Sequence, residues 1–101
     1  MLYDLVSPHD DAIYAAQSVA YTATAGSTTG WPAGPRAVLV WATTDAHVVV
    51  GEGVTATTGS TAIPANTLVK LRVPPGSGAM WRVSGIQVSA GGNVHAKPVA
   101  E

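Results

Sequence analysis

Cysteine and phenylalanine are absent from this chain of 101 residues, and charged side chains are scarce. Without cysteine, neither a disulfide framework nor a thiolate metal site can form, so stability has to come from packing, sheet hydrogen bonds and association. Charged residues make up 11% of the chain, whereas a typical soluble domain has about 25%. So little charge is unusual for a lone soluble monomer and suits a protein that stays packed against neighbours.

Clustered positive charge and long apolar runs are also missing. The five cations are scattered along the chain, at Arg36, Lys70, Arg72, Arg82 and Lys97. This scatter and the formal net charge of −1 argue against nucleic-acid binding. No stretch approaches the roughly 20 apolar residues that span a bilayer, and no basic region precedes an apolar run near Met1. We therefore expect no nucleic-acid partner, no membrane partner, and synthesis in a cytoplasm.

Helix signals are confined to the N-terminal segment. Ser7 could cap a helix that has Pro8 in its first turn and Asp10 and Asp11 at its positive end. The same residues could equally form an extended arm, and both interpretations stay open. We predict an arm over residues 1–17, extended or briefly helical, followed by one domain over residues 18–101, because a chain of this length supports a single core.

Short apolar runs separated by Gly-, Pro- and Asn-rich turns fill the rest of the chain. Residues 67–73 alternate cleanly, which predicts that Val69, Leu71 and Val73 face inward. Residues 36–43 are apolar at both parities, as in a strand that is covered on both sides. Roughly seven or eight such strands predict an all-β fold, a single antiparallel β-sandwich of jelly-roll or Greek-key type, with a small barrel as the alternative.

One strand pattern changes parity. In residues 79–88 the apolar positions begin with Trp81 and Val83 and continue with Ile86 and Val88, and the change falls at Gly85. An extra residue in a strand produces this change, and glycine favours such positions. We therefore predict a β-bulge at Gly85.

Side chains that could carry chemistry are few. Asp45 and His47 project from one face of a predicted strand, but a metal ion would need further ligands from distant residues such as Glu52 or His95. A cupin-like metal enzyme would need a histidine cluster, which three dispersed histidines do not supply.

No nucleophile set or phosphate loop is supported either. Ser7, His9 and Asp10 have suitable side chains, yet they are sequence neighbours without the turn that positions a catalytic serine. A phosphate-binding loop leads into a helix, and neither Gly51-Glu52-Gly53 nor Gly76-Ser77-Gly78 is followed by a predicted helix. We predict that the protein is not an enzyme and has no cofactor or metal site.

The three tryptophans are the large apolar anchors of the chain. Trp41 and Trp81 lie within strand patterns, which predicts that both are in the core. Trp31 lies in a turn beside Pro32, where burial and an exposed contact with a partner or a sugar both stay open.

The order of parts in residues 36–99 is distinctive. An Arg-led apolar strand (RAVLVWATTDAHVVVG) runs into Thr-Ala-Thr and then Ser-Thr-x-Ile-Pro-Ala-Asn. An alternating strand ending in Val-Pro-Pro-Gly and a short final strand follow. This order resembles the compact β-sandwich decoration or cement proteins of tailed-bacteriophage capsids.

The resemblance implies a virion protein on the capsid surface, assembled in the host cytoplasm, that forms homotrimers and clamps adjacent subunits of the major capsid protein. Arms that become ordered on docking cover a large surface with few residues. The partner contacts predicted on this basis are four arm residues and one turn residue: Leu2, Tyr3, Leu5, Val6 and Trp31. The alternative is a tail, neck or fibre module that binds carbohydrate or a host surface, with Trp31, Tyr14 and Tyr21 as its available aromatics.

Overall fold

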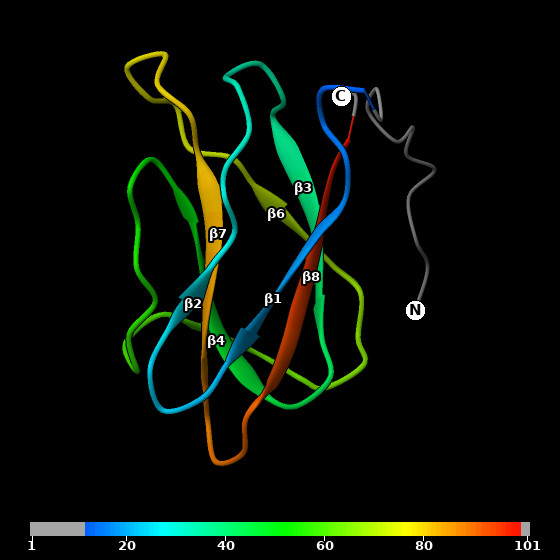
Figure 1. Cartoon of the computed structure of the whole chain (residues 1–101), viewed down its shortest axis with the longest axis vertical. Helices are drawn as coiled ribbons and strands as arrows, with labels where there is room; N and C mark the ends of the chain where they lie inside the picture. The colour runs from blue at the N-terminus through cyan, green and yellow to red at the C-terminus, as the bar shows by residue number, and fades with distance from the viewer. Residues whose placement is uncertain (1–11, 100–101) are drawn as a thin grey trace.

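The computed structural model describes residues 12–99 of the chain (Figure 1). Residues 12–16 form a turn and irregular chain instead of a helix, and the rest of the predicted arm lies outside the described residues. The eight strands are β1 (Gln17–Tyr21), β2 (Gly26–Ser27), β3 (Ala37–Ala42), β4 (Ala46–Gly51), β5 (Thr61–Ile63), β6 (Val69–Arg72), β7 (Arg82–Gln87) and β8 (Gly92–Val99).

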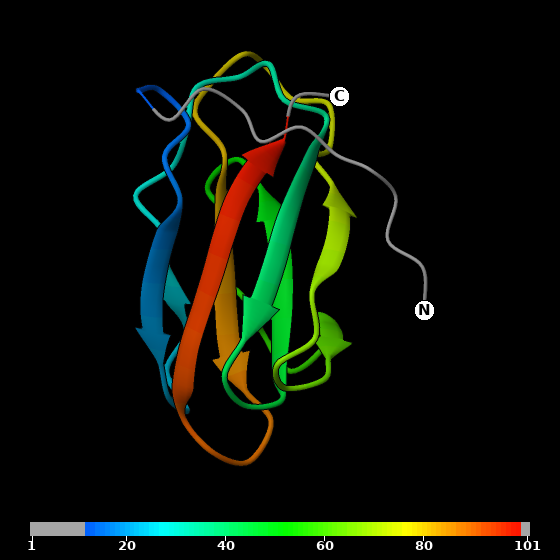
Figure 2. The same ribbon diagram turned by 90° about the vertical axis from the view of Figure 1, so that its right-hand side faces the viewer.

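The strands form two antiparallel sheets that pack face to face, which confirms the predicted all-β sandwich. Sheet A has the strand order β1-β8-β3-β6, and sheet B has the order β2-β7-β4-β5. Figure 2 looks onto sheet A, whose strands run side by side in this order in front of sheet B.

The strand pairings define the topology. Strands β1 and β8, β2 and β7, β3 and β6, and β4 and β5 pair antiparallel, as they would in one long hairpin folded at the β4–β5 connection. The further pairings β3–β8 and β4–β7 join the rolled hairpin into two sheets. This arrangement is an eight-stranded jelly roll.

Side-chain alternation places the core where the sequence predicts it. In β4, Ala46, Val48 and Val50 are buried, while His47 and Val49 between them are half-buried. Strand β6 turns its apolar residues inward and its cations outward, as predicted. The central residues of the core come from both sheets: Val38, Val40, Ala42, Ala46, Val48, Val83, Val94 and Ala96.

The predicted bulge at Gly85 is wrong. The β4–β7 register runs without interruption, with Gly85 opposite Val48. A Cβ atom at Gly85 would lie 3.4 Å from Val94 Cγ1 and 3.6 Å from Tyr21 Cδ2. Gly85 is therefore an inward position beside Val94 and Tyr21 of the opposite sheet, and Ile86 belongs to the outer face.

Two tryptophans close one end of the sandwich. Trp31 and Trp81 exchange backbone hydrogen bonds of 2.8 and 3.0 Å, and their ring centroids lie 4.8 Å apart. Trp31 Nε1 donates to the carbonyl oxygen of Ala15 at 2.8 Å, and the Tyr14 hydroxyl donates to that of Ala33 at 3.1 Å. Tyr14 belongs to the buried core, so the packed domain begins earlier than the predicted boundary at residue 18.

Candidate interaction face

The two sheets differ in what covers their outer faces. Residues 52–60 cross the outer face of sheet B and are tied to it by hydrogen bonds. Arg82 Nε donates to the Val54 carbonyl at 2.8 Å, and the Ala56 amide donates to Ser84 Oγ at 2.9 Å. Ser84 is consequently fully buried, although it lies on the outward side of its strand.

No described segment crosses the middle of the outer face of sheet A in Figure 2. At one end of this face, Ala37 and Val99 have the outward parity but are buried. Because Val38 and Val40 face the core, Leu39 and Trp41 between them face outward. The antiparallel registers place His95 opposite Trp41, and Lys97 and Lys70 on either side of Leu39. We use the name sheet A outer face for seven of the outward residues of this sheet: Ser18, Leu39, Trp41, Lys70, Arg72, His95 and Lys97.

An aromatic stack lies at the centre of this face. The Trp41 and His95 rings have centroids 5.3 Å apart and an angle of 13° between their planes, and both residues are half-buried. The prediction that Trp41 is in the core is therefore wrong. In a strand that is apolar at both parities, the smaller Val38, Val40 and Ala42 fill the space between the sheets, and the tryptophan points the other way.

The fold gathers cations that are scattered in the sequence. Lys70, Arg72 and Lys97 belong to the sheet A outer face, and Arg36 lies at its edge, because its carbonyl accepts the Val73 amide at 2.8 Å. Lys97 also donates to a backbone carbonyl of the 12–16 segment at 2.9 Å. The described residues thus place four of the chain's five Lys and Arg residues on one side of the sandwich.

The two acids among residues 12–99 are already bonded elsewhere. Asp45 Oδ1 accepts the Ala65 amide at 2.8 Å in the turn region. The Glu52 carboxylate accepts the Ser77 amide and the Ser77 hydroxyl, both at 2.9 Å. The described part of the sheet A outer face is therefore positive, with an aromatic and aliphatic centre.

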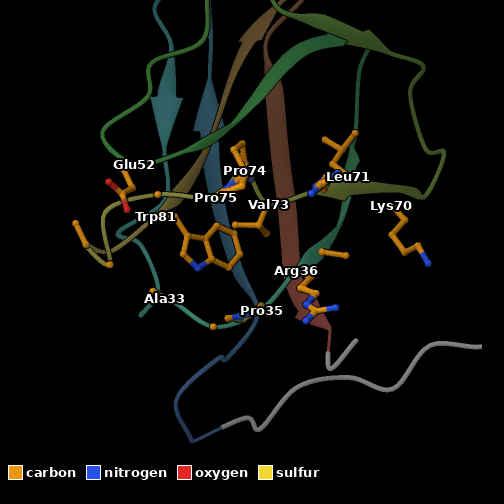
Figure 3. A pocket seen from close by; sticks show the side chains of 16 residues that line it. Ala33, Pro35, Arg36, Glu52, Lys70, Leu71, Val73, Pro74, Pro75 and Trp81 are labelled. Carbon is orange, nitrogen blue, oxygen red and sulfur yellow. The ribbon is translucent and has the colours of Figure 1, made fainter.

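An open groove of about 880 Å³ adjoins this face at the end of the sandwich (Figure 3). In the close-up, the Trp81 ring lies between the loop of Ala33 and Pro35 and the segment of Val73, Pro74 and Pro75. We call this the end groove, and its principal lining residues are Pro35, Arg36, Leu71, Arg72, Val73, Pro74, Pro75 and Trp81. It has an apolar floor and cations on the side of sheet A.

The predicted contact residues have different outcomes. Leu2, Tyr3, Leu5 and Val6 lie outside the described residues. Trp31 is only 1% exposed, so it is a core residue and not a surface contact. Sequence analysis missed the pairing of Trp41 with His95, because it depends on the register between β3 and β8, which alternation within one strand does not reveal.

The residues considered for the alternative functions are also placed by the fold. Tyr14 and Tyr21, like Trp31, are buried, so none of the three aromatics available for sugar binding is exposed. His47 and His95 belong to different sheets, and the His47 ring contacts the Ser60 carbonyl at 3.0 Å through Nδ1. Within residues 12–99, no group of three His, Cys, Asp or Glu side chains could hold a metal ion. The same part of the chain contains no helix that could span a membrane.

Comparison with known proteins gives no match to any family model, curated protein or solved structure.

Proposed function

We propose that this protein is a bacteriophage structural protein that binds the outside of the capsid shell and stabilises it by clamping adjacent major capsid subunits. The observation that carries the proposal is the partly exposed Trp41–His95 stack on the outer face of sheet A, whose middle no described segment crosses. Tryptophan and arginine are the residues most enriched among strong contacts at protein interfaces. The sheet A outer face combines Trp41 with Leu39 and a surrounding set of cations.

The surface chemistry favours a protein partner over a sugar. The chain has three tryptophans and three tyrosines; four of these aromatics are buried, and Tyr3 lies outside the described residues. Trp41 is therefore the aromatic that the described surface offers, and one ring cannot form a platform for several sugar units. The cations around it suit a partner surface that carries carboxylates.

The sequence resemblance and the topology support the same proposal. The parts that resemble phage decoration proteins, residues 36–99, cover β3 through β8 and include both members of the aromatic stack. Jelly rolls also occur among viral capsid proteins, lectins and cupins, although a shared fold is only an analogy for function. We propose the virion capsid surface as the location, with the major capsid protein and further copies of this chain in a homotrimer as partners.

The direct test is the copy number of this chain in purified particles of its phage, measured by quantitative mass spectrometry against the major capsid protein. Near parity with the shell subunit is expected for a decoration protein. A handful of copies would move the protein to the tail or neck, and complete absence would refute the virion role.

A matched pair of variants connects this test to the proposed surface. Trp41→Ala should lower the copy number strongly, because it removes the centre of the sheet A outer face. Val88→Ala truncates an apolar side chain that is 49% exposed just beyond β7 of sheet B, so it should leave the copy number unchanged. Equal incorporation of both variants would contradict the assignment of the binding face.

A further inference from the structure

The end groove has the chemistry of a site for an extended segment that alternates apolar and acidic residues. Trp81, Leu71 and Val73 form an apolar floor, and Pro74 and Pro75 line one wall (Figure 3). Its volume of about 880 Å³ falls in the range of ligand-binding clefts. Apolar side chains can therefore enter the groove while charged neighbours stay at its rim.

The rim supplies positive charge at a defined position. Arg36 and Arg72 are both exposed and both line the groove. The Val73 amide bonds to the Arg36 carbonyl at 2.8 Å, which holds the two arginines at the same end of the β3–β6 pair. On the opposite side, Glu52 is occupied by its two hydrogen bonds to Ser77 and thereby holds the loop after Pro75 in place.

The N-terminal sequence of the chain contains a run of apolar and acidic residues that complements the apolar floor and the arginines of the groove. Three of the six acids lie within residues 1–11, and the first of them, Asp4, stands in the run Leu2-Tyr3-Asp4-Leu5-Val6. In an extended conformation, Tyr3 and Leu5 project to one side and Asp4 to the other. This pattern matches a groove with an apolar floor and an arginine rim.

The position of the 12–16 segment favours a second copy as the source of this run. The Tyr14 hydroxyl bonds to the Ala33 carbonyl, and the Trp31 indole bonds to Ala15. The loop of Ala33 to Arg36 is also a wall of the groove, whereas Tyr14 and Ala15 do not line the groove. The 12–16 segment therefore contacts the side of this loop that faces away from the groove. Residues 2–6 of a neighbouring molecule can enter the open groove from solution.

We infer that the end groove binds residues 2–6 of a second copy of this chain, with Tyr3 and Leu5 on its apolar floor and Asp4 beside Arg36 and Arg72. Since donor segment and acceptor groove are different surfaces, each copy can donate to one neighbour and accept from another, and such a head-to-tail contact forms a ring when its rotation closes. A ring of three would be the proposed homotrimer. The inference deepens the proposed function by naming how copies contact each other.

Sedimentation of the full-length protein over a range of concentrations tests the inference through charge reversal. Arg72→Glu and Asp4→Lys should each weaken self-association by about tenfold, and the double variant should recover most of it, because the swapped pair is again complementary. Asp10→Lys makes the same charge change outside residues 2–6 and should leave association unchanged. Thermal unfolding of each variant checks that the fold is intact.

Two results would overturn the inference. One is a wild-type protein that sediments as a monomer at all concentrations, which is also the outcome if each molecule fills its own groove. The other is a double variant that associates no better than the single variants. Capsid binding is read separately from the copy number in particles, so failure of the groove and failure of the proposed function can be distinguished.

Discussion

Trp41 and His95 lie nearly parallel on the outer face of sheet A, with their ring centroids 5.3 Å apart. They come from β3 and β8, two neighbouring strands that are far apart in sequence, and stand directly opposite each other in the antiparallel register. A partly exposed stack of this kind contributes less to folding than a buried ring and leaves apolar area available to a partner.

Trp41→Ala should therefore separate binding from stability. We expect the free energy of unfolding to fall by only about 1 kcal/mol, because the ring lies on the outer face and no cavity is left in the core. Urea unfolding followed by circular dichroism measures this. A loss above about 3 kcal/mol would show that Trp41 acts as a core residue.

Trp31→Ala should have the opposite effect. The ring is 1% exposed, packs on Trp81 and donates to the Ala15 carbonyl. Its removal leaves a large cavity, for which a loss of about 3–5 kcal/mol is expected. In a domain of this size that loss is a large share of the total stability, so we expect partial or complete unfolding at room temperature in the same urea experiment.

Tyr21→Phe probes a partly buried hydrogen bond between β1 and the turn after β3. The Tyr21 hydroxyl lies 2.9 Å from the Thr44 carbonyl and 2.7 Å from Thr44 Oγ1, and Thr44 Oγ1 donates to the Ala90 carbonyl at 2.9 Å. The variant keeps the ring and removes only the hydroxyl, so we expect a loss of about 1–2 kcal/mol in the free energy of unfolding. Hydrogen exchange should also become faster in the turn after β3, and unchanged exchange there would argue that this bond does not hold the turn.

Gly26→Ala tests a close approach between two strands. A Cβ atom at Gly26 would collide with the Ala20 carbonyl oxygen, a backbone atom that cannot rotate away. We expect a loss of about 1–3 kcal/mol, as for other overpacked sites. Gly59→Ala is the matched control, because its nearest neighbour would be Thr57 Oγ1 at 3.6 Å, an ordinary contact. Similar melting temperatures for the two variants would contradict the steric argument.

Much of the fold follows from local pattern. Alternation identified the inward residues of β6 because this strand has one apolar and one charged face, so only one orientation buries the apolar side chains. The number of short strands and the turn residues between them likewise indicated a sandwich. Each of these features depends on residues close together in the chain.

The candidate site depended on information that local pattern lacks. Scattered cations became one positive face because β3, β6 and β8, which lie far apart in the sequence, are neighbours in sheet A. Gly85 has no side chain at an inward position next to Val94 and Tyr21 of the other sheet, so the apolar pattern of its strand changes there without a bulge.

The sequence by itself determined an all-β fold of short antiparallel strands, since period-two alternation needs only the geometry of a strand. The tertiary structure decided that these strands form two sheets and not a barrel, because strand pairing is non-local. Only the tertiary structure decided which tryptophan is buried. Trp31 lies in irregular chain, where no period predicts its direction, and the fold carries it into the end of the core. Trp41 lies in a strand that is apolar on both sides, and the space between the sheets accepted the smaller side chains and left the larger ring outside.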